Sequence, residues 1–228
     1  MAKKAKKKVK RGGSRAYRVM YAIFAGIVSF IFNYKVVNPE NEPDNEGCIV
    51  CANHVSATDA IALCYAFKKN QVHFMAKKEL FKVPVLAPLI KMLGAFPIDR
   101  GGNDVGAVKK AIGLVEGGST LGIFPQGHRY PGENPRNTKT KNGMALIASK
   151  TQADIVPAYI WRKKNRFKLF RRTYIILGKA IPFSSLCYDP EASGEYARIT
   201  AEVFDKICSI GEDFEKELRE KKSKKGNK

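Results

Sequence analysis

Short apolar runs alternate with segments of helical periodicity from residue 47 onward, and this alternation constrains the fold more than any other feature of the chain. Alternating strands and helices build an α/β fold, in which helices cover a sheet. We therefore expect an α/β protein with a mixed central sheet flanked by helices. The 228 residues suffice for one such domain with a substantial core and are too few for two full ones.

Apolar runs predict strands at residues 48–52, 72–76, 96–98, 120–124, 154–161 and 173–178. Helical periodicity predicts helices at residues 58–69, 103–116, 141–150 and 194–220. The last helix carries one apolar stripe, as expected of a helix packed on one side, made of Ile199, Val203, Ile207, Ile210 and Phe214. A polar loop at residues 125–140 is too long for a plain connection, and loops of this length often carry function.

Basic residues outnumber acidic ones by 41 to 21, which gives a net charge of +20. Such an excess implies an anionic partner, either nucleic acid or an anionic lipid surface. Much of the charge lies in two tails, residues 1–14 and 221–228, which lack an apolar cluster that could anchor them. We expect both tails to be disordered and solvated. They either serve solubility alone or hold the protein near anionic headgroups, at roughly 1 kcal/mol per basic residue.

A third basic cluster lies inside the predicted folded region, and we expect it on the same face as the tails: Arg162, Lys163, Lys164, Arg166, Lys168, Arg171 and Arg172. The alternative partner, nucleic acid, is not favoured. The sequence shows no platform of interleaved basic and aromatic residues, no zinc-finger spacing and no helix-turn-helix pattern. We therefore expect an anionic membrane surface as the partner and no nucleic acid.

An uncharged apolar segment at residues 19–32 follows the N-terminal tail. As a helix rising ~1.5 Å per residue it spans about 21 Å, which is short of the ~30 Å hydrocarbon core of a bilayer. A signal peptide would match its charge and length, but no small-residue cleavage site follows. The segment is either a core helix or a helix lying in one leaflet, and its basic and aromatic flanks favour the interfacial anchor. We expect residues 15–44 to form a membrane-associating helical segment ahead of an α/β domain at 45–220.

Five cysteines at irregular positions argue against a disulfide framework and fit a reducing compartment. Combined with the apolar segment, this predicts a monotopic or shortly anchored protein on the cytoplasmic face of the cell membrane. Cys48 and Cys51 have CxxC spacing, but they lie in one apolar run, and residues three apart on a strand point to opposite faces. We expect no metal site and no bound cofactor.

The stretch from Asn53 to Asp59 follows the first predicted strand. Ligands of α/β sheets tend to bind beyond the carboxyl ends of strands. If the Asp59 carboxylate meets the His54 imidazole, it fixes the tautomer and stabilises the imidazolium while the other ring nitrogen removes a proton. No serine or cysteine nucleophile is needed when a substrate hydroxyl attacks. In the alternative, His54 is a loop histidine and Asp59 a helix-start residue favoured by the helix dipole.

Two later stretches place arginines after predicted strands. Arg100 ends the run that begins at Gly94, where a guanidinium is suited to bidentate binding of a phosphate. The alternative for Arg100 is a salt bridge with Asp99 or another neighbour. Arg129 ends residues 124–129, which present an amide, a glycine backbone and a guanidinium together; the alternative is a turn with a solvated arginine.

In order and spacing, four blocks across roughly residues 45–180 resemble the glycerolipid acyltransferase family, in particular its 1-acylglycerol-3-phosphate acyltransferases. The Asn-His-x4-Asp block of the family is matched by Asn53, His54 and Asp59, with the frequent Ser56. Its Ile-Asp-Arg block ends at Arg100. Its Phe-Pro-Glu-Gly-Thr-Arg block is matched in part by residues 124–129, and its apolar strand ending in proline by residues 155–157.

The resemblance implies transfer of a fatty acyl group from acyl-CoA or acyl carrier protein to the sn-2 hydroxyl of lysophosphatidic acid (1-acylglycerol 3-phosphate), giving phosphatidic acid in phospholipid synthesis. His54 and Asp59 would be the catalytic pair, and Arg100 with Arg129 would hold the phosphate. The remaining expected substrate-binding residues are Asn53, Ser56, Gln126 and Gly127. Backbone N–H groups near Gly127 would stabilise the oxyanion.

The third block departs from the family at Gln126 and His128, where glutamate and threonine are usual. The family glutamate helps to position the acyl acceptor, and a glutamine keeps the hydrogen-bonding reach but loses the charge. Glycerol 3-phosphate, another lysophospholipid or an amine-bearing lipid is therefore an alternative acceptor. A membrane-binding relative that has lost catalysis is a further alternative. We expect His128 to contact substrate or support structure, and His73 to be structural.

Overall fold

The computed structural model describes residues 15–44, 47–99 and 104–226, with side chains described between residues 21 and 224 of these ranges. A seven-stranded sheet forms its centre, in the order β1-β7-β6-β2-β5-β3-β4. The strands are β1 (Tyr34–Val37), β2 (Ile49–Ala52), β3 (Val72–Lys77), β4 (Ala95–Ile98), β5 (Thr120–Ile123), β6 (Ile155–Trp161) and β7 (Thr173–Leu177). The α-helices are α1 (Arg15–Phe32), α2 (Asp59–Ala66), α3 (Leu86–Met92), α4 (Val105–Glu116), α5 (Gly143–Thr151) and α6 (Glu195–Gly226).

The sheet is mixed, as the sequence predicts. Strands β6, β2, β5, β3 and β4 are all parallel to one another, whereas β7 is antiparallel to β6 and β1 is parallel to β7. Parallel strands end at the same edge of a sheet, so the segments that follow the five parallel strands converge there. This edge holds residues 53–59 and 124–129, two of the segments for which the sequence predicts chemistry.

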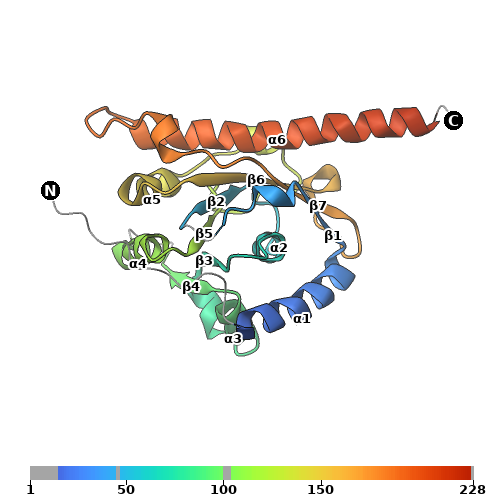
Figure 1. Cartoon of the computed structure of the whole chain (residues 1–228), viewed down its shortest axis with the longest axis horizontal. Helices are drawn as coiled ribbons and strands as arrows, with labels where there is room; N and C mark the ends of the chain where they lie inside the picture. The colour runs from blue at the N-terminus through green and yellow to red at the C-terminus, as the bar shows by residue number, and fades with distance from the viewer. Residues whose placement is uncertain (1–14, 45–46, 100–103, 227–228) are drawn as a thin grey trace.

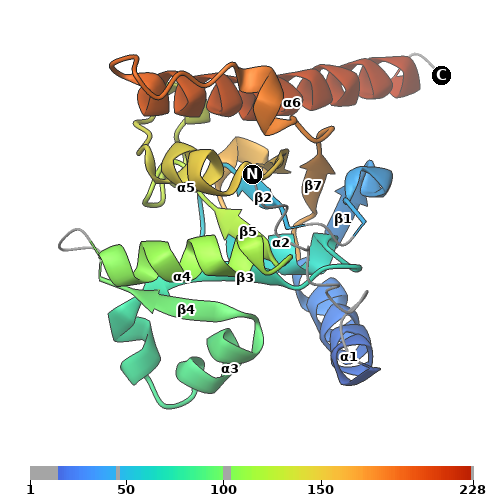
Figure 2. The same ribbon diagram turned by 60° about the vertical axis from the view of Figure 1, so that its left-hand side comes forward.

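Helices cover both faces of the sheet (Figures 1 and 2). Helices α4, α5 and α6 pack on one face, and α1 and α2 pack on the other. The β2 side chains alternate between these two cores: Ile49 and Cys51 face α4–α6, and Val50 and Ala52 face α1 and α2. A strand covered on both faces is apolar at every position, which explains its continuous apolar run. Cys48 and Cys51 lie in opposite cores, as predicted.

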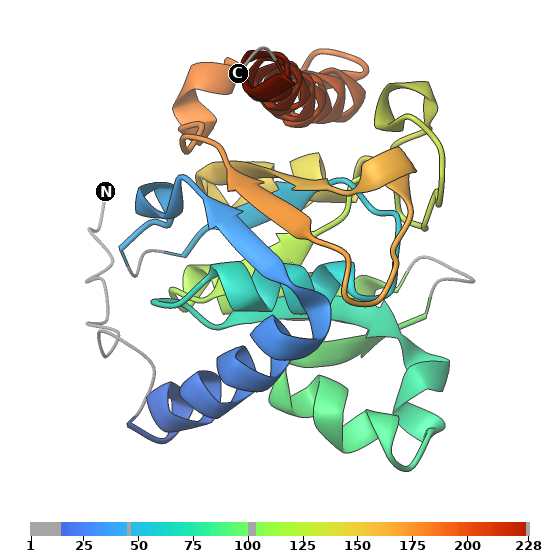
Figure 3. The ribbon, with the colours of Figure 1, turned by 90° about the vertical axis from the view of Figure 1, so that its right-hand side faces the viewer.

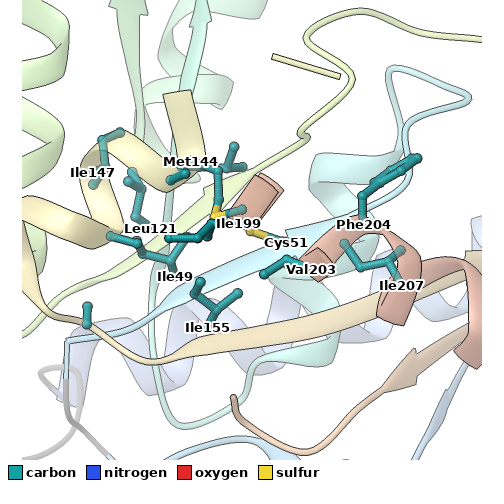
Figure 4. Close-up of a cluster of buried hydrophobic side chains, with 14 of the residues drawn as sticks. Ile49, Cys51, Leu121, Met144, Ile147, Ile155, Ile199, Val203, Phe204 and Ile207 are labelled. Atoms are coloured by element: carbon teal, nitrogen blue, oxygen red, sulfur yellow. The ribbon is translucent and has the colours of Figure 1, made fainter. Parts of the chain in front are cut away.

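Helix α6 spans one whole side of the molecule (Figure 1) and packs by its predicted stripe. Ile199, Val203 and Ile207 are fully buried, and Figure 4 shows them next to the sheet residues Ile49 and Ile155. Burial of each such aliphatic side chain stabilises the fold by roughly 1.5–3 kcal/mol.

The helix does not end at residue 220 but continues to Gly226, so the prediction of a disordered tail is wrong for residues 221–226. Ion pairs one turn apart support the extension, between Arg219 and Glu215 at 3.0 Å and between Lys221 and Glu217 at 3.3 Å. Residues 1–14, predicted to form the other tail, lie outside the described residues.

The N-terminal segment is helical only in part. Helix α1 ends at Phe32, and Tyr34–Val37 then forms strand β1 at the edge of the sheet, paired with β7. The expectation of a helical segment over all of residues 15–44 is therefore wrong for this strand. No helix within the described ranges combines the length and apolar character needed to cross a membrane.

Other boundaries differ modestly from the predictions. Helix α2 ends at Ala66 rather than near residue 69, and the proline-interrupted region at 80–93 contains the short helix α3. The long loop at 125–140 contains a 3-10 turn, Pro135–Asn137. This loop is tied to α6 by Arg136, which forms ion pairs with Asp205 and Glu212.

Candidate active site

Three loops meet at the carboxyl edge of the parallel strands. Residues 53–59 follow β2, residues 124–129 follow β5, and Arg162 follows β6. Strand β2 lies between β5 and β6, so its loop contacts both of the others.

The predicted pair of His54 and Asp59 is formed. The imidazole Nδ1 lies 2.8 Å from Asp59 Oδ2. The turn at residues 55–58 brings the two side chains together, and Asp59 is the first residue of α2. An ionised carboxylate only accepts hydrogen bonds, so Nδ1 is the donor and Nε2 remains the basic nitrogen. The imidazole is 12% exposed, whereas the carboxylate is fully buried.

Four donors converge on the Asp59 carboxylate. Oδ2 accepts hydrogen bonds from the His54 ring, from Val55 N at 2.7 Å and from Ser56 N at 2.8 Å, and Oδ1 accepts one from Arg162. Burial by itself raises the pKa of Asp59, but the Arg162 charge and the hydrogen bonds outweigh it and leave the pKa below its ordinary value. The carboxylate is therefore ionised at neutral pH.

Arg162 is a member of the site that the sequence analysis missed. Its side chain is 1% exposed, so its assignment to a basic surface cluster is wrong. The guanidinium also donates to Thr58 Oγ1 at 3.1 Å and to Thr173 Oγ1 at 3.3 Å. One available signal was position: Arg162 directly follows an apolar strand that we had predicted.

Gln126 is buried and links two loops of the site. Its Oε1 accepts from His54 N at 2.6 Å, and its Nε2 donates to Thr138 Oγ1 at 2.7 Å. Thr138 belongs to the long loop at 125–140, so this loop helps to hold the Gln126 side chain in place. Both polar ends of the amide bind protein groups. The substrate-binding role of Gln126 stays a prediction.

Asn53 and Ser56 also make bonds within the protein. The Asn53 amide pairs with the Ile160 backbone of the neighbouring strand, accepting from its N–H at 2.7 Å and donating to its C=O at 3.2 Å. The Ser56 hydroxyl accepts from Thr58 N at 3.3 Å and lies 3.1 Å from Thr58 Oγ1. These contacts hold the shape of the turn between His54 and Asp59.

An aromatic stack supports the imidazole. The His54 ring lies 4.1 Å from the Phe124 ring, at an interplanar angle of 11°, and Phe124 in turn stacks on Phe74 at 5.9 Å. The backbone of His54 is also fixed, because its C=O accepts from Tyr130 N at 2.9 Å. The ring is thus held by a carboxylate at one edge and an aromatic face, while its Nε2 has no hydrogen-bond partner among the described residues.

The turn after β5 differs from one expectation. Gly127 has a φ of +73°, a conformation that favours glycine. Its N–H donates to Phe124 O at 2.9 Å. The Gly127 N–H is therefore engaged within the turn, which disfavours it as an oxyanion donor. Arg129 is exposed and presents its guanidinium to solvent, without an ion pair in the described part of the chain.

Arg100 lies outside the described residues, so its predicted role is untouched by the geometry. Its neighbour Asp99 forms an ion pair with Lys78. His73 Nδ1 donates to Gly94 O at 3.1 Å, which agrees with a structural role. His128 is exposed, and its ring lies against Tyr130. Within the described ranges, no three His, Cys, Asp or Glu side chains are grouped to hold a metal ion.

Comparison with known proteins gives consistent matches. The family model described as Acyltransferase matches residues 33–161. A 1-acyl-sn-glycerol-3-phosphate acyltransferase of Bacillus subtilis (strain 168) is 31% identical over 166 residues, which are 72% of this chain and 81% of that protein. A protein of the same name from Streptococcus pneumoniae is 33% identical over 147 residues, 61% of this chain and 53% of that protein.

The fold has a crystallographic counterpart. The 1-acyl-sn-glycerophosphate (LPA) acyltransferase PlsC from Thermotoga maritima superposes with a TM-score of 0.67 at 22% identity, over 88% of this chain and 82% of that one. At this identity the likeness concerns the fold alone.

A mixed α/β sheet with a His–Asp pair at the carboxyl edge of its parallel strands is an arrangement suited to acid–base chemistry. The family match over more than half of the chain and the Bacillus subtilis relative then decide the class. The chain belongs to the acyltransferase family.

Proposed function

We propose that this acyltransferase moves a fatty acyl group from a thioester donor to the sn-2 hydroxyl of 1-acylglycerol 3-phosphate, giving phosphatidic acid for phospholipid synthesis. The His54–Asp59 pair carries the proposal, because it leaves Nε2 as a base for a hydroxyl. The acceptor is taken from the relatives, which are named 1-acyl-sn-glycerol-3-phosphate acyltransferases. Acyl-CoA or acyl carrier protein is the donor, and the net charge of +20 suits either anionic molecule.

In the proposed reaction, His54 Nε2 takes the proton of the acceptor hydroxyl as its oxygen attacks the thioester carbonyl carbon. Asp59 stabilises the imidazolium through the 2.8 Å bond to Nδ1. When the tetrahedral intermediate collapses, the C–S bond breaks, and the imidazolium returns the proton to the departing thiolate. General base catalysis of this kind contributes about 100- to 10,000-fold, and alignment of the two substrates supplies much of the remainder.

Arginines hold the acceptor phosphate in this proposal. Arg129 suits this role, because its guanidinium is exposed at the end of the loop 124–129, which Gln126 links to His54. Arg100 is its proposed second partner on the basis of the family motif. Bidentate guanidinium–phosphate bonds would fix the glycerol backbone relative to the imidazole.

The buried position of Gln126 bears on the choice of acceptor. A glutamine here places no negative charge beside the His54 backbone, and its two polar ends bind protein groups. We therefore expect the exchange of glutamate for glutamine to affect the acceptor through the conformation of the loop, and not through a direct contact with the acceptor. Glycerol 3-phosphate and other lysophospholipids remain the acceptors to test second.

We also propose that the protein works on an anionic membrane surface, at the cytoplasmic face of the cell membrane. Helices α1 and α3 lie together on the side opposite α6 (Figure 3). Large apolar side chains are exposed along α1, at Ile23, Ile27 and Phe30, of which Phe30 is 82% exposed. Others are exposed at and before α3: Val83, Val85, Leu89 and Met92. An apolar surface of this extent on one side suits insertion between lipid headgroups.

A vesicle experiment tests the membrane proposal. Ile27→Ser combined with Phe30→Ser should weaken co-sedimentation with vesicles of phosphatidylglycerol and phosphatidylcholine by at least tenfold. Val105→Ser is the matched control, because Val105 is also an exposed apolar residue but lies on α4. Equal binding of the double variant and the control would refute a membrane-binding role of α1.

The activity test uses purified protein with lysophosphatidic acid and either acyl-CoA or acyl carrier protein loaded with a fatty acid. Phosphatidic acid should form with one donor at least and should be lost in His54→Ala. Arg129→Ala should chiefly raise the acceptor KM, whereas Arg198→Ala, which removes an exposed arginine at the start of α6, should not. If folded wild type makes no product from lysophosphatidic acid but acylates another acceptor, the proposed acceptor is wrong. Failure with every acceptor would indicate a non-catalytic relative.

A further inference from the structure

Arg162 stands out among the charged residues because it is buried directly after β6, beside the His54–Asp59 pair. Its side chain is 1% exposed, although it opens a run of basic residues that are mostly on the surface. An arginine is costly to bury unless all of its donors are paired. A buried arginine contributes neither to solubility nor to surface charge, so Arg162 has another role.

All three nitrogens of the guanidinium have partners, two at the start of α2 and one on β7. One terminal nitrogen binds Asp59 Oδ1 at the start of α2, and the other donates to Thr58 Oγ1 at 3.1 Å. Nε donates to Thr173 Oγ1 at the start of β7, 3.3 Å away. The guanidinium also lies over the Phe167 ring, with its central carbon 5.6 Å from the ring centroid. Because the guanidinium is planar and all of its nitrogens are bound, it holds the Asp59 carboxylate in one orientation.

The two oxygens of Asp59 are thereby divided between two tasks. Oδ1 binds Arg162, and Oδ2 binds the His54 ring and two backbone N–H groups. If the guanidinium were absent, Oδ1 would be buried without a partner, and only the two backbone N–H groups would hold Oδ2 toward Nδ1. Arg162 therefore acts on the position of the pair through the Asp59 carboxylate.

We propose that Arg162 is a positioning residue for acyl transfer, which aims the Asp59 carboxylate at His54 Nδ1 and so keeps Nε2 as the nitrogen that accepts a proton. It does not contact the reacting atoms and acts through Asp59. The inference rests on the proposed function for its kinetic consequences, but its effect on His54 does not depend on any substrate.

Few other titratable groups surround the pair in the described part of the chain. Tyr34 on β1 donates from its hydroxyl to Thr58 O at 3.1 Å, and burial raises its pKa to about 12, so it is neutral across the working range. His128, Arg129 and Tyr130 belong to the loop that binds the His54 backbone. Asp59 and Arg162 are the charged groups whose bonds reach His54 directly or through one residue.

The test compares Arg162→Met, Arg162→Lys and the control Arg198→Met. Arg198 is a half-exposed arginine with ion pairs to Glu195 and Glu202, far along the chain from the pair. The His54 C2–H resonance is followed by NMR against pH in each variant; the chain has three histidines, so assignment is simple. The pH profile of kcat and the acceptor KM are measured in parallel.

Arg162→Met should move the His54 titration and the acid limb of kcat to higher pH, because removing the arginine removes a positive charge near the imidazole. Its kcat should fall by roughly 100-fold, within the range that a general base contributes, with acceptor KM within about threefold of wild type. Arg162→Lys keeps the positive charge but loses the planar guanidinium. The His54 titration should therefore stay near wild type in this variant, while kcat still falls about tenfold. Arg198→Met should change neither.

Two results would overturn the inference. One is a folded Arg162→Met protein whose His54 titration and kcat match wild type, which would make Arg162 a purely structural residue. The other, should Arg162→Met not fold, is an Arg162→Lys protein with wild-type kcat. If wild type lacks activity on every acceptor, the proposed function fails, but the His54 titration still tests the positioning role.

Discussion

Asp59→Asn is the most informative single substitution in this protein, because it removes one charge and almost no volume. The asparagine can keep its carbonyl oxygen toward His54, Val55 N and Ser56 N, but its amide NH2 then faces Arg162. Two donors meet, and a guanidinium that is 1% exposed loses its counter-ion. Removing one partner of a buried ion pair costs about 3–5 kcal/mol of unfolding free energy.

That cost is a large share of the total stability of a domain, about 5–15 kcal/mol. With a urea m-value of about 2–3 kcal/mol per M, the unfolding midpoint should fall by roughly 1–2.5 M. Activity should fall by more than 100-fold even in the fraction that is folded, because the imidazole loses the group that fixes its tautomer. Urea unfolding followed by circular dichroism measures the first effect, and phosphatidic acid formation the second.

The pH dependence gives the sign of the electrostatic contribution. The folded state lowers the pKa of Asp59 below its value of about 3.9 in the unfolded chain. The carboxylate therefore contributes its full stability above about pH 4, and this contribution is lost as the pH falls through the lower, folded-state pKa. The difference between wild type and Asp59→Asn should be constant near neutral pH and shrink in acid.

Asp213→Asn is the matched control, since Asp213 is exposed on α6 and forms no ion pair within the described residues. In the double variant Asp59→Asn/Arg162→Met the loss should be smaller than the sum of the two single losses, because the second change removes the unpaired charge. An Asp59→Asn protein within about 1 kcal/mol of wild type would contradict the assignment of Arg162 as a buried partner that depends on this carboxylate.

Three further outcomes are expected. Asn53→Ala should lower the unfolding free energy by about 1–3 kcal/mol, because it leaves the buried Ile160 N–H and C=O without side-chain partners; unchanged thermal stability would contradict this. Gly127→Ala should raise the acceptor KM and cost about 1 kcal/mol, since φ is +73° and the new Cβ would lie 2.9 Å from Lys141 Cδ; kinetics at wild-type values would show that the turn tolerates a side chain. Maleimide should label only Cys187 in the folded protein, because the other four cysteines are buried; mass spectrometry that finds a second fast site would refute that packing.

Local patterns in the sequence accounted for much of this protein. Strand and helix periodicity predicted the sheet elements from β2 onward within a few residues, because both faces of the sheet are covered and apolar residues follow at every position. The His54–Asp59 contact could also be predicted, since five residues across one turn at the start of a helix restrict the two side chains to a small region. The motif blocks then identified the family.

Strand β1 could not be predicted from its own residues. Tyr34–Val37 includes an exposed lysine and pairs with β7, almost 140 residues away in the chain. A four-residue segment carries too little pattern to be distinguished from the end of the preceding helix, and its pairing depends on the position of β7 in the folded sheet. The length of α6 was likewise set by ion pairs along the helix rather than by apolar periodicity.

Local sequence patterns were enough to identify the α/β class, the loop that bears the histidine and the aspartate, and the family. Two features of the site depend on how distant segments pack together: which of seven clustered basic residues binds Asp59, and which loop residue binds the Gln126 amide. The physical reason is burial: Arg162 and its neighbours have the same charge and similar length. What distinguishes Arg162 is that β6 lies beside β2 in the sheet, a pairing between segments about 100 residues apart that no local pattern encodes.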